Sequence, residues 1–275
     1  KEENIMVVQH NLSAMNTNRQ MGVVTSALQK STEKLSSGYK INRAGDDAAG
    51  LSISEKMRSQ IRGLNKASDN AQDGISLIQV AEGALNETHS ILQRMNELAT
   101  QAANDTNTSV DRQSIKDEIE QLNEELDRIS TTTQFNKQDL LTGGFSGKLQ
   151  VGALEGQTMD VKISLAVSAN GLRVSAVEVS TNAKAGIAMQ SIQDAIESVS
   201  KQRSKLGAIQ NRLEHTINNL DTNAENTQAA ESRIRDTDMA DEMVQYSKNN
   251  ILSQAGQSML AQANQQTQGV LSLLG

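Results

Sequence analysis

The longest pattern in the chain is a heptad repeat of apolar residues between Met57 and Ala102. Apolar side chains recur there at alternating spacings of four and three, which predicts a coiled-coil-like helix rather than a helix lying on a globule. The members of this seam are Met57, Ile61, Leu64, Ala71, Ile75, Ile78, Leu85, Leu92, Met95, Ala99 and Ala102, with breaks at Ser68, Glu82 and His89. At 1.5 Å per residue, the predicted helix spans about 70 Å.

Two further seams follow the same spacing, and Thr108–Ser109 is the expected N-cap of the first of them. That seam consists of Ile115, Ile119, Leu122, Leu126 and Ile129. The other, interrupted by Arg203 and Gln210, consists of Ile192, Ile196, Val199, Leu206, Leu213, Ile217, Leu220 and Ala224. Three helices with matching seams can bury one another, so the pattern predicts a long helical bundle.

Between the second and third helices the period changes to two, as in β-strands. Apolar residues alternate with polar ones at Met159, Val161, Ile163 and Leu165, and in the pairs Leu149 with Val151, Leu172 with Val174, and Val177 with Val179. Glycines separate these runs, which predicts β-hairpins at about residues 140–182. The predicted fold class is therefore mainly α: an elongated, coiled-coil-like helical bundle with a small β-hairpin region.

The two ends of the chain are nearly free of charge. Residues 6–29 carry one formal charge, Arg19, and no charged residue follows Lys248. A face of modest hydrophobicity runs along the C-terminal end through Ile251, Ala255, Met259 and Ala263, and then through Val270, Leu273 and Leu274. A long helix with so weak a face is marginal alone in water. Two interpretations stay open: the ends are disordered tails, or they pair with each other or with other copies.

Composition excludes several classes of protein. The 275 residues include no Pro, Cys or Trp and only four aromatic residues, too few for the core of a compact globule of this size. Without cysteine there is no disulfide scaffold, thiolate metal site or thiol nucleophile. A net charge of −7 argues against nucleic-acid binding, and no stretch approaches the roughly 18 apolar residues of a membrane span. Residues 1–13 lack the basic and apolar regions of a secretory signal. Residues 1–5 precede a plausible initiator, Met6, and we expect them to be non-native.

No motif for catalysis or cofactor binding is present. The three histidines, His10, His89 and His215, share no metal-binding spacing, and no phosphate-binding loop or nucleophile motif occurs. The sequence therefore predicts neither an enzyme nor a cofactor.

Several segments resemble the signatures of bacterial flagellins, in order, from about residue 7 to the end. The N-terminal ones are Leu35–Asn42 with Asp46–Gly50, Ala71–Ser76, Glu82–Asn86, Leu92–Ala99 and Thr133–Asn136. The C-terminal ones are Ala230–Asp236, Gln262–Gln265 and Val270–Leu274. Such a resemblance implies an inner domain of paired terminal helices with its linker (residues 1–46 and 236–275) and a rod-like outer domain (residues 47–235). Only about 50 residues separate Phe135 from the third helix, so we expect the minimal form without large variable outer domains.

The resemblance implies a structural subunit that is exported by the flagellar type III apparatus and polymerises into the extracellular flagellar filament. Polymerisation is expected to rest on the terminal helices, through Leu12, Met15, Val24, Leu28, Leu35, Ile251, Ala255, Met259, Leu260, Val270, Leu273 and Leu274. Expected partners are other flagellin subunits, the filament cap and hook-associated proteins, and an export chaperone at the C-terminus; neither nucleic acid nor membrane insertion is expected.

The resemblance also implies a surface for the flagellin-sensing Toll-like receptor of vertebrate hosts. Arg94 and Leu98 match the family's motif, and Glu118 is placed by its spacing. The nearest alternative function is a hook–filament junction protein, which shares the terminal architecture. A soluble coiled-coil adhesin or secreted effector is a further alternative, but it would have no reason for uncharged helical ends at both termini.

Overall fold

The structure, a computed structural model, describes the backbone of residues 11–274 and the side chains of residues 11–266. The described chain is mainly helical, as predicted, with α1 (Leu12–Ser37), α2 (Ala48–Ala102), α3 (Ser109–Thr132), α4 (Asn182–Arg235) and α5 (Met239–Leu274). It divides into two compact units. We call Gln60–Asn226 the rod unit, and the chain up to Ser59 together with the chain from Thr227 onward the terminal unit. The domain boundaries predicted from the sequence lie between residues 46 and 47, just before α2, and between residues 235 and 236, at the end of α4.

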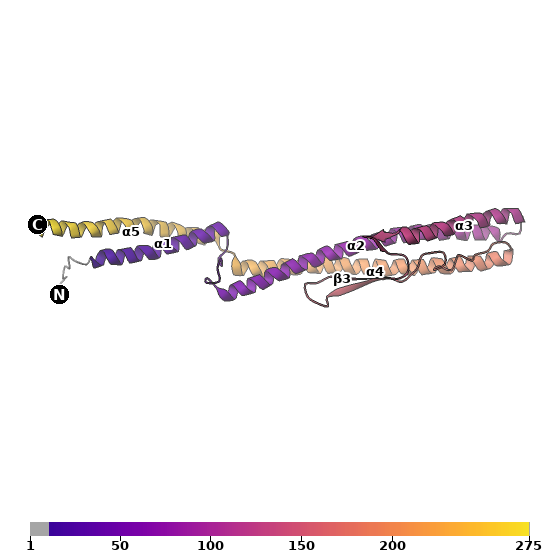
Figure 1. Ribbon diagram of the computed structural model, residues 1–275, viewed down its shortest axis with the longest axis horizontal. Coiled ribbons are helices and arrows are strands. Elements are labelled where there is room, and N and C mark those ends of the chain that lie inside the picture. Colours follow the sequence, from indigo (N-terminus) through magenta and orange to yellow (C-terminus); the bar gives the residue numbers. More distant parts are fainter. Residues whose placement is uncertain (1–10, 275) are drawn as a thin grey trace. The chain divides into compact units, whose positions relative to one another are not determined.

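In the rod unit, α2, α3 and α4 run alongside one another (Figure 1). The predicted heptad seams form their common core, where Leu85, Leu92 and Leu206 are fully buried. Fully burying a side chain of this size contributes about 1.5–3 kcal/mol. The polar residue Gln202 of α4 is also buried in this unit, and its side-chain amide donates a hydrogen bond to the carbonyl of Lys162 at 3.3 Å. The rod is thus held by one large apolar cluster, with a smaller cluster of Leu64, Ala67, Leu220 and Ala224 near its end.

The predicted N-cap of α3 is confirmed. The Thr108 hydroxyl accepts a hydrogen bond from the Asp111 amide, and the Asp111 carboxylate accepts one from the Thr108 amide. This reciprocal capping box satisfies two amides that the first helical turn leaves without partners.

Two antiparallel hairpins connect α3 to α4. The first pairs β1 (Gln134–Phe135) with β2 (Gln138–Asp139) through a turn in which Asn136 and Lys137 have positive φ. The second pairs β3 (Phe145–Gln150) with β4 (Thr158–Ile163), whose Met159, Val161 and Ile163 are buried in strict alternation. The hairpin packs closely on α2: a Cβ atom added at Gly74 would lie 2.3 Å from Leu149 Cδ1.

The predicted strands at Leu172–Val174 and Val177–Val179 are wrong. Residues 164–181 contain no strand, because Arg173 has a φ of 60° and the amides of Leu172 and Val174 donate to nearby carbonyls in turns. The alternation still reflects burial, since Leu172, Val174 and Val179 belong to the core. An irregular segment that covers a core can bury every second residue without pairing.

In the terminal unit, α1 and α5 lie side by side (Figure 1). They run antiparallel, because the side chain of Asn11 donates to the carbonyl of Ala263 at 2.9 Å and Lys34 pairs with Glu242 at 3.3 Å. Helix α1 ends at Gly38, whose φ of 76° lies in the left-handed region that favours glycine.

Candidate functional site

The contact between α1 and α5 mixes small and polar side chains with larger apolar ones. In α1 the least exposed positions recur at spacings of three and four: Ala14, Thr17, Met21, Val24, Leu28, Ser31 and Leu35. The corresponding positions in α5 are Glu242, Tyr246, Asn249, Ser253, Gly256, Leu260 and Ala263. Within the described side chains of the two helices, Ser31 and Ala263 alone are buried, at 5% and 8% exposure. The pair therefore has the spacing of a coiled coil but little of its apolar core.

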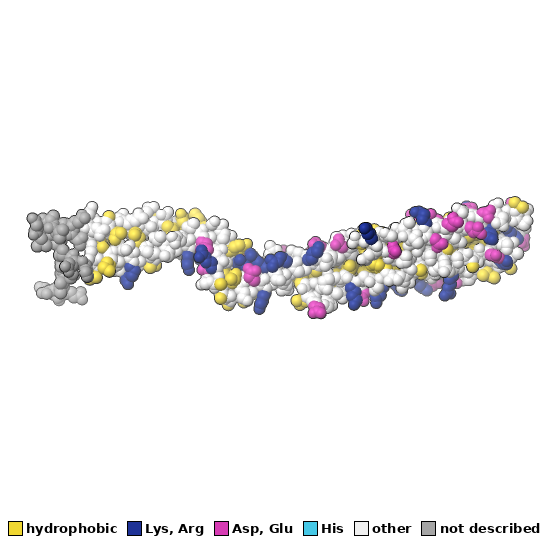
Figure 2. Space-filling view, viewed as in Figure 1, with side chains coloured by type: hydrophobic (Ala, Val, Ile, Leu, Met, Phe, Trp, Pro, Cys, Tyr) yellow, Lys and Arg dark blue, Asp and Glu magenta, His cyan; other side chains and the backbone are white. Residues whose placement is uncertain are grey.

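Bulky apolar side chains instead lie on the outer faces of the same two helices. Leu12 and Ile251 are each 67% exposed, and Val23 and Met259 are exposed to a similar degree. Also exposed on α5 are Met239, Met243, Val244 and Leu252. Figure 2 shows this part of the surface as hydrophobic patches among uncharged polar groups, with few charges. Large exposed apolar patches are typical of surfaces that bind other proteins.

The predicted polymerisation residues fall into three groups. Exposed ones are Leu12, Met15, Ile251, Ala255 and Met259. Half-buried ones in the contact between the helices are Val24, Leu28, Leu35 and Leu260. The side chains of Val270, Leu273 and Leu274 lie outside the described residues.

Where α1 leads into α2 and α4 leads into α5, a cluster around Tyr39 holds the two connections together. The guanidinium groups of Arg58 (α2) and Arg235 (α4) each lie 5.0 Å from the centre of the Tyr39 ring, within the range of a cation–π contact. Two backbone hydrogen bonds link the connections: Lys40 donates to Arg235 at 2.7 Å, and Thr237 donates to Gly38 at 3.0 Å. We call Tyr39, Arg58 and Arg235, with their acidic partners, the Tyr39 joint.

The acidic partners of the Tyr39 joint are crossed between the helices. Arg58 of α2 pairs with the nearly buried Glu231 of α4 at 2.8 Å, and Arg235 of α4 pairs with Glu55 of α2 at 2.6 Å. Burial disfavours the charged form of Arg58, but hydrogen bonding to Tyr39 and the charge and hydrogen bond of Glu231 outweigh it and raise the pKa of Arg58. Sequence reasoning missed this joint: Tyr39 lies in a recognised segment, but no local pattern links it to arginines so distant in sequence.

The structure brings two of the three predicted receptor residues together. Arg94 of α2 pairs with Glu118 of α3 at 2.8 Å and with Glu97 at 3.2 Å, and hydrogen bonding to Glu118 and Glu97 raises the pKa of Arg94. These side chains are exposed. Leu98, in contrast, is 2% exposed and belongs to the core of the rod unit, because it lies on the inner side of α2.

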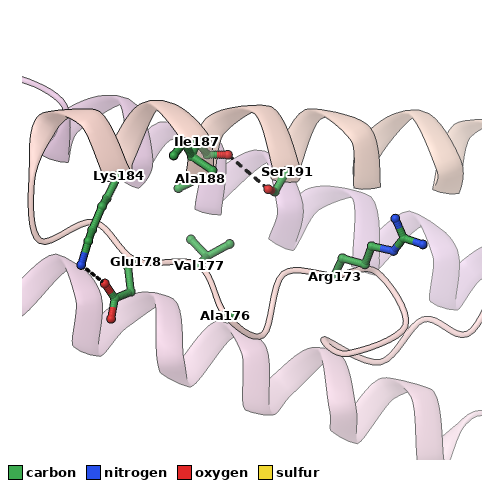
Figure 3. A pocket seen from close by; sticks show the side chains of 8 residues that line it. All are labelled: Arg173, Ala176, Val177, Glu178, Lys184, Ile187, Ala188 and Ser191. Carbon is green, nitrogen blue, oxygen red and sulfur yellow. Dashed lines mark hydrogen bonds and ion pairs between the residues drawn. The ribbon is translucent and has the colours of Figure 1, made fainter.

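A notch with a volume of about 310 Å³ lies in the rod unit between α4 and the irregular segment before it (Figure 3). Lys184 and Glu178 pair at one side of the notch, and Arg173 lies at the other. Ile187 and Val177 line it with apolar surface. This combination has no nucleophile with an adjacent base, and the described residues contain no cluster of side chains able to hold a metal ion.

No helix in the described part of the chain has both the length and the hydrophobicity needed to cross a membrane.

Comparison with known families identifies the family of the chain. The model of the bacterial flagellin N-terminal helical region matches residues 8–146, and that of the C-terminal helical region matches residues 189–274. The chain belongs to the bacterial flagellin family. It is 56% identical to a flagellin of Halalkalibacterium halodurans over 271 residues, which cover 98% of this chain and all of the relative. It is 53% identical to a flagellin of Bacillus subtilis, with coverage of 98% and 100%.

Among solved structures, a crystal structure of Bacillus cereus flagellin is similar, at 33% identity and a TM-score of 0.51. The match covers 59% of this flagellin and 94% of that chain. Flagellins are structural filament subunits and not enzymes, and the filament lies outside the cell. The prediction of the compact form is confirmed as well, since residues 164–181 are all that separates β4 from α4.

Proposed function

We propose that the outer faces of α1 and α5 are the surfaces through which flagellin subunits join into the filament. The observation that carries this proposal is the incomplete burial of apolar residues in the pair. The larger apolar residues between the helices are only half-buried, while Leu12, Ile251 and Met259 face outward. Each large apolar side chain that another copy covers adds about 1.5–3 kcal/mol to the association.

The same incomplete burial makes the α1/α5 pair depend on neighbouring subunits for its stability. Small residues such as Ser31 and Gly256 alternate in the contact with larger apolar residues that stay half-buried, so the isolated pair gains little from forming. Incorporation supplies the missing burial and offsets the ordering of the helices. Contacts between different patches on successive copies do not close into a ring, so they generate a helical filament.

Seeded growth of filaments tests the proposal with a matched pair of variants. We expect the double variant Ile251→Ser/Met259→Ser to remain a helical monomer and to elongate filament fragments at least about tenfold more slowly, because two outward anchors are lost. The control is Gln257→Ser, which changes an exposed polar residue on the same helix and should grow normally. Growth of the double variant at the wild-type rate would refute the proposal.

Removing residues 251–275 is the stronger form of the same test. The truncated chain should stay soluble and helical, without forming filaments. If the wild-type chain stays monomeric under conditions in which another flagellin polymerises, the result would favour the alternative function, a hook–filament junction protein.

We also propose export of the unfolded chain by the flagellar type III apparatus, followed by assembly beneath the filament cap beyond the hook-associated proteins. The absence of Pro and Cys supports this, because such a chain refolds without slow isomerisation or disulfide formation.

A chaperone that binds the C-terminal residues would keep the assembly surface covered before export. Secretion should stop in cells that lack the export apparatus, and removing residues 236–275 should abolish chaperone capture.

A second proposed activity is recognition by the flagellin-sensing Toll-like receptor of the host. It is supported by the exposed Arg94–Glu118 pair, where two predicted residues from different helices meet. We expect Arg94→Ala to weaken binding of the receptor ectodomain by about tenfold or more, as for a charged interface anchor. The control is Arg128→Ala, which removes an arginine of another exposed ion pair, with Glu125. Equal binding by both variants and the wild type would contradict this proposal.

A further inference from the structure

The methionines of the two units differ in how far they are exposed to solvent. Nine of the ten lie among the residues whose side chains the structure describes. In the rod unit, Met95 is 0% and Met159 is 8% exposed, and Met189 packs against the core. Four methionines are exposed: Met15 (65%), Met239 (48%), Met243 (50%) and Met259 (61%). Within the described residues, all four belong to α1 and α5.

This placement has a chemical consequence, because an exposed thioether reacts with peroxides. Hydrogen peroxide transfers one oxygen atom to the sulfur: the peroxide O–O bond breaks, a sulfoxide S–O bond forms, and the reduced oxygen leaves as water. The product is polar where the thioether was apolar, and methionine sulfoxide reductases reverse the change. Burial in the rod core denies peroxide access to Met95 and Met159.

We propose that α1 and α5 of the free subunit form an oxidation site, and that sulfoxides at Met15, Met239, Met243 and Met259 block assembly. The effect on assembly rests on the proposed function of the outer faces, whereas the selectivity of the oxidation rests on exposure alone. When another subunit covers a sulfoxide, the sulfoxide oxygen loses its hydrogen bonds to water and gains no partner, which makes association less favourable. In the filament the same residues are covered, so polymerised subunits resist the oxidant.

Peptide mass spectrometry after hydrogen peroxide treatment tests the selectivity. In the monomer, the four exposed methionines should be oxidised at least about tenfold faster than Met95 and Met159, since reactivity follows access of the reagent. In filaments the rates at the four sites should fall toward those of the buried pair. Equal rates at exposed and buried methionines in the monomer, or unchanged rates in the filament, would overturn the proposal.

A set of leucine variants tests the effect on assembly. Leucine is close to methionine in volume and apolarity but does not oxidise. The variant Met15→Leu/Met239→Leu/Met243→Leu/Met259→Leu should therefore elongate seeds after peroxide at the same rate as it does without peroxide. Wild-type protein and the control Met189→Leu should lose about tenfold or more of their growth rate after peroxide and recover it with the reductase. Loss of growth by the fourfold variant after peroxide would overturn the proposal. Untreated growth reports separately on the proposed function.

Discussion

The rod unit and the α1/α5 pair share the same heptad spacing but differ in how far the residues at the heptad positions are buried. In the rod, the spaced positions carry residues such as Leu85, Leu92 and Leu206, which are fully buried. In the pair several of them carry small residues such as Ser31 and Gly256, and the larger apolar ones, such as Leu28, are only half-buried. Other large apolar side chains of the pair point outward. Spacing therefore determines which positions face a neighbouring helix. Residue identity determines whether that contact is stable within one chain or needs contacts with other subunits.

The largest expected effect separates folding from assembly. Leu92→Ala should lower the free energy of unfolding by about 2–5 kcal/mol, because it removes a fully buried side chain from the rod core. Met259→Ala, at an exposed position, should leave it within about 0.5 kcal/mol. Urea unfolding of the monomer, followed by circular dichroism, measures both. Similar losses in the two variants would mean that the pair and the rod do not differ as described.

A second prediction tests how tightly the rod is packed. Gly74→Ala should destabilise the monomer by about 1–3 kcal/mol, because the new Cβ atom would lie 2.3 Å from Leu149 of the hairpin. Gly83→Ala, in the same helix, meets no atom within 4 Å and should stabilise by up to about 1 kcal/mol. Thermal unfolding of both variants gives the comparison. If the two substitutions shift the melting temperature in the same direction, the hairpin is not packed closely on α2.

A third prediction concerns the Tyr39 joint. Tyr39→Ala should cost about 1–3 kcal/mol of local stability, because two cation–π contacts are lost, and Tyr39→Phe should cost less than half of this. The measurement is hydrogen exchange at the amides of Lys40 and Thr237, which bond across the two connections. Exchange that is equally fast in both variants would show that the hydroxyl group, rather than the ring, holds the joint.

The smallest effect is a pH dependence at the start of α3. Hydrogen bonds from the Thr108 side chain and amide lower the pKa of Asp111 below its usual value of about 4. The folded state therefore holds this proton less tightly than the unfolded state, so the stabilisation is complete above pH about 4 and is lost as the pH falls through the lowered pKa. Nuclear magnetic resonance of the Thr108 and Asp111 amides in acid should show this transition. Thr108→Val should move it toward the usual value, and an unmoved transition would contradict the capping box.

Most of the helical architecture could be predicted from the sequence, because the period of the apolar residues is a local property. The seams around Leu92, Leu126 and Leu206 and the cap at Thr108 are examples. The strand prediction for Leu172–Val179 was wrong, since alternating burial in a covering segment has the same period as a strand. Pattern alone cannot tell whether a partner strand exists.

The candidate site was only partly accessible to sequence reasoning. Charge and composition identified the two ends, but the expected face Ile251–Ala263 divides in the structure: Ile251 and Met259 point outward and Ala263 lies against α1. Which side of a weakly amphipathic helix meets its partner depends on the partner helix. The Tyr39 joint, which gathers residues from both halves of the chain, has no local signature at all.

Hydrogen exchange in the free subunit and in the filament tests the central claim most directly. We expect amides of α2 and α4 in the rod unit to be protected in both states, since their core is complete within one chain. Amides of α5 around Ile251–Met259 should exchange rapidly in the monomer and gain about a hundredfold or more in protection on polymerisation, as expected for helices ordered by association. If α5 were already as protected in the monomer as the rod helices, the pair would be stable alone, and the account of its outward apolar faces would be contradicted.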